Sequence, residues 1–175
     1  MNSSPPIDAA PIDADAAAHS ERLRALIGAE IAVAGGAIPF SRFMELALYA
    51  PGLGYYSAGA AKFGAAGDFV TAPELGALFA ECVAQAVAPV IRQFGEEAVF
   101  VEIGGGSGAF AEAAIERLMA TDAMPARYAI LEPSADLRER QRERLRRKLM
   151  PAVFERVAWL NGPIEVRWNG VLFAN

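Results

Sequence analysis

The sequence feature that most constrains the fold is a short apolar run, residues 98–103, that contains one acid and opens directly into glycines. Strands covered on both faces of a parallel sheet are nearly continuous apolar runs, and this segment has that pattern apart from Glu102. Gly104, Gly106 and Gly108 follow, and glycine lets the backbone turn sharply and approach a ligand closely. The pattern predicts a buried strand, a tight turn and a helix from about residue 109 whose first amides face a ligand.

Two classes of nucleotide cofactor use a turn of this kind. Gly104, Gly106 and Ala109 satisfy the dinucleotide fingerprint Gly-x-Gly-x-x-Gly/Ala of NAD sites. A Gly-x-Gly-x-Gly preceded by an acid is typical of S-adenosylmethionine (SAM) sites, and residues 102–108 fit it in full. The cationic sulfonium and amino groups of SAM suit Glu102, because a carboxylate in an apolar strand must be paired or hydrogen-bonded. A third interpretation stays open, in which the glycines only pack a helix on the sheet and Glu102 bonds to neighbouring amides.

A second strand is predicted at residues 126–131 and ends at Glu132. An acid at this position accepts the ribose hydroxyls of a nucleotide cofactor, and the alternative is a solvated acid in a turn. A helix at 135–149 and strands at 157–160 and 170–174 follow. This alternation predicts an α/β fold, with a parallel, Rossmann-like sheet of about four strands joined by right-handed crossovers.

The sequence of the N-terminal part predicts an acidic tail followed by helices. Residues 1–20 are rich in Ala and Pro, contain acids and no Lys or Arg, and predict a disordered acidic tail without a targeting signal. Apolar residues at helical spacing predict helices over about 20–34, 38–49 and 75–94, and the stripe of the last one contains Cys82, which indicates a core position. The predicted divisions are a tail at 1–20, a helical region at 21–95 and the first part of a cofactor-binding domain at 96–175.

Residues 59–74 read as a long loop, and loops of this length in a compact domain tend to be functional. The loop contains Asp68 and ends in Thr71-Ala-Pro73-Glu74. Those last residues form either a helix capping box with a first-turn proline or a functional element, and the sequence favours neither.

Composition excludes several classes of function. A net charge of −5 argues against nonspecific nucleic-acid binding. Cys82 and His19 are the only cysteine and histidine, which excludes a disulfide framework and a His/Cys metal cluster. No apolar run approaches the ~20 residues that span a bilayer, so we expect no membrane insertion and a cytoplasmic location in a bacterium.

Several motifs, in this order and spacing, resemble the MidA family of class I SAM-dependent methyltransferases. They are Ile38-Pro-Phe-Ser-Arg-Phe-Met44, Leu48-Tyr49 with Pro51, Gly54-Tyr-Tyr56, Gly67-Asp-Phe-Val-Thr-Ala-Pro-Glu74 and Glu102-Ile-Gly-Gly-Gly-Ser-Gly108. The block at 67–74 is the most specific, because methyltransferases in general lack it. The resemblance covers roughly residues 38–175. Mitochondrial members of the family act in the assembly of respiratory complex I by methylating an arginine of a partner subunit.

The resemblance implies a function and a site. It implies a SAM-dependent methyltransferase acting on an arginine of a protein partner, with Asp68 and Glu74 as the catalytic acids that orient the guanidinium and accept its proton. The cofactor would be held by Glu102, Gly104, Gly106, Gly108 and Glu132, with Thr71 and Pro73 in a loop that caps the pocket. No metal is implied.

Two departures from the family pattern qualify this prediction. Gly105 stands where the family usually has Pro. Family members are also about twice as long, and Asn175 matches the first residue of a later Asn-Glu-x-x-Asp-Ala block, so we expect this chain to be an N-terminal portion. Its activity is then open, and two alternatives remain: an NAD-dependent oxidoreductase, and a non-catalytic fragment that binds partners or associates with itself through an exposed sheet edge.

Overall fold

The computed structural model describes residues 14–58 and 76–175. The chain divides into two compact units, Met1–Tyr55 and Tyr56–Asn175, and each is described by itself. The predictions for Asp68, Thr71, Pro73 and Glu74 fall outside the described residues.

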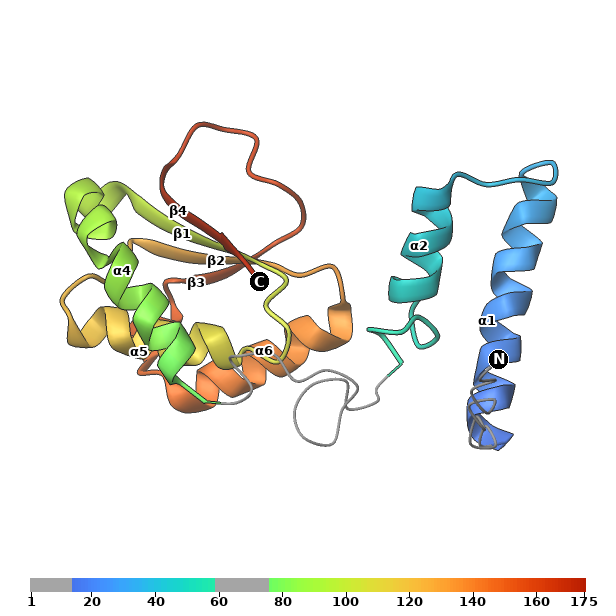
Figure 1. Ribbon diagram of the computed structural model, residues 1–175, viewed down its shortest axis with the longest axis horizontal. Helices are drawn as coiled ribbons and strands as arrows, with labels where there is room; N and C mark the ends of the chain where they lie inside the picture. Colours follow the sequence, from blue (N-terminus) through green and yellow to red (C-terminus); the bar gives the residue numbers. More distant parts are fainter. Residues whose placement is uncertain (1–13, 59–75) are drawn as a thin grey trace, which may run out of the picture. The chain divides into compact units, whose positions relative to one another are not determined.

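The first unit contains two helices, α1 (Ala14–Val33) and α2 (Phe40–Tyr49), shown in Figure 1. α1 begins earlier than the sequence predicted, and residues 14–20 are helical where a disordered tail was expected, because alanine is the strongest helix former. His19 on α1 is half-buried, and its Nε2 lies 2.8 Å from the carbonyl oxygen of Leu53 in the turn after α2.

The predicted second helix is confirmed as α2, but its apolar stripe is not the packed face. Phe40 is 74% exposed and Phe43 39%, whereas Leu46 and Ala50 are buried. Arg42 of α2 forms an ion pair with Glu30 of α1. The two helices are therefore joined by a charged contact as well as by apolar burial.

The second unit alternates helices with parallel strands (Figure 1). Its elements are α4 (Leu78–Phe94), the short 3₁₀ helix η1 (Gly95–Glu97), β1 (Ala98–Ile103), α5 (Ala109–Ala120), β2 (Arg127–Leu131), α6 (Ala135–Lys148), α7 (Pro151–Phe154), β3 (Val157–Leu160) and β4 (Asn169–Ala174). The four strands lie in the order β3-β2-β1-β4, and each pair is parallel. The predicted α/β class and four-stranded sheet are confirmed.

One face of the sheet carries the hydrophobic core. Right-handed crossovers in one direction, from β1 to β2 and on to β3, place α5 and α6 on the same face. Phe110 of α5 stacks on Phe173 of β4 at 4.1 Å between ring centroids, and Phe100 of β1 stacks on Tyr128 of β2 at 4.8 Å.

None of the helices in the described ranges is both long enough and apolar enough to cross a membrane.

Helix α4 packs on the sheet, although its residues lie in the helical region predicted at 21–95. Its contact face is lined by Ala80, Ala84 and Ala88, all fully buried, and these small side chains let α4 approach α5 closely. Cys82 is exposed, so the core position predicted for it was wrong. Two residues along a helix rotate a side chain by roughly 200°, which turns Cys82 away from the face that carries Ala80.

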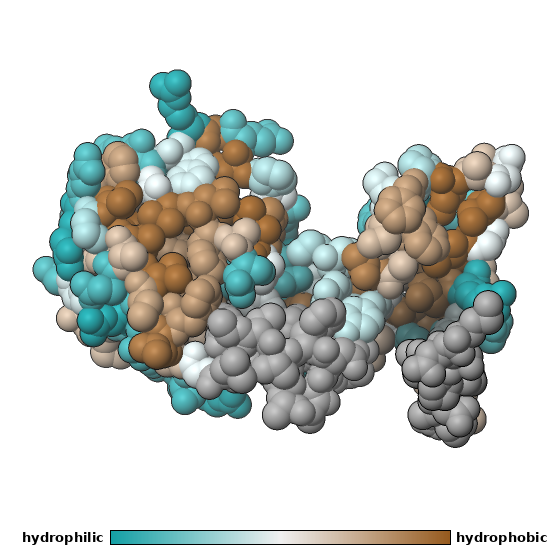
Figure 2. All heavy atoms as spheres, viewed as in Figure 1, coloured by the Kyte–Doolittle hydropathy of each residue, from teal (hydrophilic) through white to brown (hydrophobic). Residues whose placement is uncertain are grey.

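β4 pairs only with β1 among the described residues. Leu172 on this strand is 57% exposed, and Figure 2 shows hydrophobic side chains gathered over β4 and α4 in that view. Open strand edges favour pairing with another chain. Self-association through this edge stays a prediction.

The register of β4 on β1 predicts that Gly170 tolerates no side chain. Its φ is +142°, and a Cβ there would lie 1.9 Å from the carbonyl oxygen of Val99. We expect Gly170→Ala to lower the free energy of unfolding by about 2 kcal/mol or more in urea denaturation. Gly162→Ala is the matched control, since a Cβ at Gly162 meets no atom within 4 Å. Equal stability of both variants would contradict the β1–β4 register.

Candidate functional site

The glycine turn leaves the carboxyl end of β1 and leads into α5. The φ values of the turn are +74° at Gly104, +53° at Gly106 and +80° at Gly108. Residues other than glycine rarely adopt this backbone conformation. The amide of Gly104 donates a hydrogen bond of 2.9 Å to the carbonyl oxygen of Leu131 at the end of β2. The predicted sequence of strand, turn and helix is confirmed, and each glycine is required by the backbone.

The remaining glycine of the turn, Gly105, packs closely against two neighbouring side chains. A Cβ there would lie 3.0 Å from Nε2 of Gln141 and 3.0 Å from Cγ2 of Ile130. By contrast, a Cβ at Gly104 would meet no described atom within 4 Å. The turn is therefore tightly supported on the side of Gln141 and open at Gly104, which leaves room for a ligand against its backbone.

Glu102 is buried at the end of β1, with 2% of its surface exposed. Its partner is the phenol of Tyr128 on β2, whose Oη donates a hydrogen bond of 2.8 Å to Oε2 of Glu102, rather than the neighbouring amides considered from the sequence. Burial, with a smaller contribution from the charge of Glu132, raises the pKa of Glu102 to about 7 against the opposing effect of the Tyr128 hydrogen bond. This carboxyl is therefore poised to exchange its proton near neutral pH.

Glu132 follows β2 and is 4% exposed, so the interpretation as a solvated turn acid was wrong. Its Oε1 accepts a hydrogen bond of 3.0 Å from the amide of Ser134. The backbone of Gly106 and the side chain of Gln141 also donate to this carboxylate, which lowers its pKa, but burial has the larger effect and raises it. Glu132 is thus bonded to the glycine turn that follows the neighbouring strand.

Ser134 begins α6 beside this carboxylate and is fully buried. Its Oγ accepts a hydrogen bond of 3.2 Å from the amide of Leu137, which caps the helix. The same hydroxyl donates a bond of 2.6 Å to the carbonyl oxygen of Tyr56. Ser134 therefore fixes both the start of α6 and a backbone segment that precedes the sheet by many residues.

The buried polar side chains of the described residues gather here. Those identified as buried and polar or charged are Glu102, Glu132, Ser134 and Gln141. Glu102 lies near the end of β1, Glu132 and Ser134 follow β2, and Gln141 contacts the glycine turn. No buried side-chain nitrogen or oxygen in the described ranges lacks a partner. Burying polar groups is costly unless all of them are hydrogen-bonded, so such a cluster in an otherwise apolar core indicates a functional site.

Tyr128 and Gln141 were not predicted from the sequence as residues of the site. A signal for Gln141 was present, because it stands four residues from both Leu137 and Leu145 on the buried stripe of a helix otherwise rich in charge. Tyr128 pairs with Phe100 in the register of β1 and β2, and Phe100 stands two residues before Glu102. The contact between Tyr128 and Glu102 therefore follows only from the register. The structure brings together Glu102, Glu132 and the three predicted glycines of the turn.

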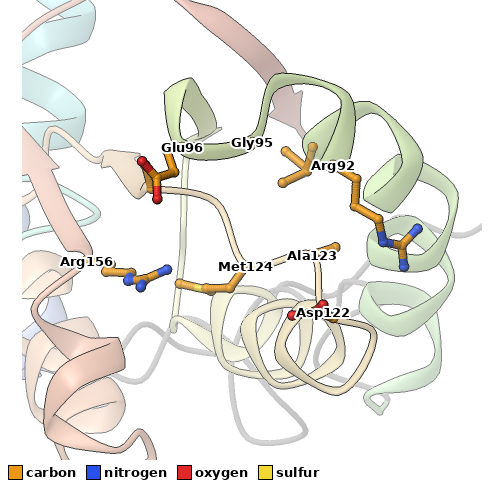
Figure 3. Close-up of a pocket in the computed structure, with 9 residues that line it drawn as sticks. Arg92, Gly95, Glu96, Asp122, Ala123, Met124 and Arg156 are labelled. Atoms are coloured by element: carbon orange, nitrogen blue, oxygen red, sulfur yellow. The ribbon is translucent and has the colours of Figure 1, made fainter.

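A pocket of about 570 Å³ lies at the other end of the sheet. It is lined by residues that immediately precede β1, β2 and β3, among them Glu96, Met124 and Arg156. Figure 3 shows Glu96 and Arg156 on one side of it and Arg92 on the other. Ligands of open parallel sheets bind beyond the carboxyl ends of the strands, so the glycine turn, not this pocket, is the candidate cofactor site.

Comparisons with known proteins relate this chain to methyltransferases. Residues 82–175 match the sequence model of a family described as "Putative S-adenosyl-L-methionine-dependent methyltransferase". The crystal structure of a "COG1565 superfamily member and likely methyl transferase" from Burkholderia thailandensis, bound to S-adenosyl-homocysteine, is 46% identical, with a TM-score of 0.78. A native crystal structure of an uncharacterized COG1565 superfamily protein from the same organism is 44% identical, with a TM-score of 0.74.

The extent of these matches is uneven. Each of the two solved structures matches 95% of this chain, whereas the chain spans only 43% and 41% of those two proteins. Comparison with curated proteins gave no match. Because the family model covers residues 82–175 of a 175-residue chain, and so more than half of it, this chain belongs to the family of S-adenosyl-L-methionine-dependent methyltransferases that the model describes.

Proposed function

We propose that this chain forms the cofactor-binding part of a SAM-dependent methyltransferase. The observation that carries the proposal is the pair of buried acids at the carboxyl ends of two adjacent strands, Glu102 near the end of β1 and Glu132 directly after β2, beside the glycine turn. The 46% identical protein bound to S-adenosyl-homocysteine supports SAM over a nicotinamide dinucleotide.

The residues present fit this cofactor. The space beside Gly104 is open, so a ligand can contact the backbone of the turn there. The first backbone amides of α5 come shortly after the turn and can bind the same ligand. Glu102 supplies negative charge for the cationic amino and sulfonium groups, and Glu132 supplies acceptors for ribose hydroxyls. Bound SAM would supply an activated methyl group, and the chain's own part is to hold it in line and exclude water.

The acceptor that we propose is an arginine side chain of a partner protein. The support is the resemblance to the MidA family, together with the chemistry of the guanidinium, which is protonated at neutral pH and needs a carboxylate to orient it and accept a proton. Asp68 and Glu74 are the candidate acids, and both lie outside the described residues. A cytoplasmic location in a bacterium is part of the same proposal.

The cofactor assignment predicts that Gly106 is essential for SAM binding. Gly106→Val places a branched side chain at a φ of +53°, so we expect saturable SAM binding by the parent chain and none by the variant in titration calorimetry. Gly162→Val is the control, since Gly162 is remote in sequence and open in space. Circular dichroism verifies folding. Unchanged SAM binding by Gly106→Val, or saturable binding of NAD in place of SAM, would refute the assignment.

The pKa of Glu102 predicts that SAM affinity depends on pH. Below about pH 7 this carboxyl is protonated in the free protein, and a cation prefers the ionised form, so binding releases a proton and affinity rises with pH until it levels above 7. We expect a change of up to about tenfold per pH unit between pH 5.5 and 7. Glu102→Gln should remove the part of the pH dependence of SAM affinity that comes from Glu102. Any pH dependence that comes from the titration of Glu132 should remain. A parent chain with constant affinity over this range would contradict the role of Glu102.

The proposed acceptor predicts which acids matter for transfer rather than binding. In an assay with methyl-labelled SAM and arginine-containing peptides, we expect Asp68→Asn or Glu74→Gln to lower methyl transfer by about a hundredfold while leaving SAM affinity unchanged. Asp15→Asn, an exposed acid on α1, is the control. Labelling at lysine, or equal transfer by all three variants, would contradict the arginine proposal.

A further inference from the structure

Gln141 is an unusual residue for its place in α6. The buried stripe of this helix consists of Leu137, Gln141 and Leu145, and the Gln141 side chain is fully buried between the two leucines in sequence. An apolar residue at this position would pack without any desolvation of an amide. The amide is therefore best explained by the groups to which it bonds.

Two partners fix the orientation of this amide. The indole Nε1 of Trp159 on β3 donates a hydrogen bond of 2.8 Å to Oε1 of Gln141, and Nε2 of Gln141 donates one of 2.9 Å to the carbonyl oxygen of Gly106. An indole nitrogen only donates and a carbonyl only accepts. The reversed amide would face N–H against N–H and oxygen against oxygen, so Trp159 forces the amino group of Gln141 toward the glycine turn.

The same amino group also reaches Glu132, since the Gln141 side chain donates a hydrogen bond to that carboxylate. One amide thus joins the turn that follows β1 to the acid that follows β2. The contact extends to packing, because Cβ atoms placed at Gly105 and Gly108 would lie 3.0 Å and 3.3 Å from Gln141 atoms. Gln141 supports the turn from beneath along most of its length.

We propose that Gln141 is a positioning residue for the cofactor and that Trp159 holds it in the working orientation. Gln141 aligns Gly106 and Glu132 so that the turn amides and the carboxylate face one ligand. The connection runs from the glycine turn to the ring of Trp159, which also lies 4.8 Å from the guanidinium carbon of Arg142. This inference rests on the proposed SAM site, and it makes Trp159 an intrinsic reporter of cofactor binding.

The test uses Gln141→Leu, which keeps a similar volume and removes the hydrogen bonds to Trp159, Gly106 and Glu132. It is made in the full chain with Trp168→Phe, so that Trp159 is the remaining tryptophan. Titration calorimetry gives the Kd for SAM and for S-adenosyl-homocysteine. We expect Gln141→Leu to weaken both by about tenfold, as for the loss of a buried hydrogen bond, and Trp159→Phe to weaken them by less. Leu145→Val is the control, because it trims the same buried face without touching a hydrogen bond.

Fluorescence supplies a readout that a purely structural role would not move. We expect SAM to shift the Trp159 emission in the Trp168→Phe parent and in Leu145→Val, and to leave it unshifted in Gln141→Leu even when saturated. A folded Gln141→Leu variant with the parent's SAM affinity and emission shift would overturn the inference while leaving the proposed function intact. A folded parent that binds neither SAM nor S-adenosyl-homocysteine would overturn both.

Discussion

The pairing of β1 on both of its sides is the constraint on which the rest of the second unit depends. β2 and β4 flank this strand and satisfy its backbone on both edges, and its buried side chains pack against α4 and against Phe110 of α5. The chain leaves β1 through glycines because the turn must bend with positive φ values beside β2 and above Gln141. The central strand therefore fixes where the site lies as well as how the sheet packs.

The acids and amides around this turn form two groups of hydrogen bonds inside an apolar core. Tyr128 bonds to Glu102, Gln141 and Ser134 bond to Glu132, and Trp159 bonds to Gln141. In a low-dielectric interior each of these groups would be costly if left unpaired, and paired they hold one arrangement. Burial accounts for the raised pKa of Glu102, and the nearby charge of Glu132 adds to it, whereas the hydrogen bond from Tyr128 opposes it.

Most of the fold and the central residues of the site could be predicted from the sequence, because glycine spacing and apolar runs are local signals. The strands around Glu102 and Glu132 were predicted in the order in which the structure has them. Tyr128 was missed because a partner on the neighbouring strand can be identified only from the strand register. Gln141 was missed because the partners of its buried amide, Gly106 and Trp159, are distant in the sequence. Cys82 was misplaced for a different reason: the pattern favoured large apolar residues, whereas α4 packs through alanines.

The place of β4 beside β1 also has a consequence for synthesis of the chain. β2 pairs with β1 after one short crossover, but β4 reaches β1 only after β2 and β3 have been made. On the ribosome, where domains begin to form as they emerge, β1 stays an outer strand until residues 169–174 leave the exit tunnel. The edge of β1 that pairs with β4 is thus left open until late in synthesis, whereas the edge that pairs with β2 is covered earlier.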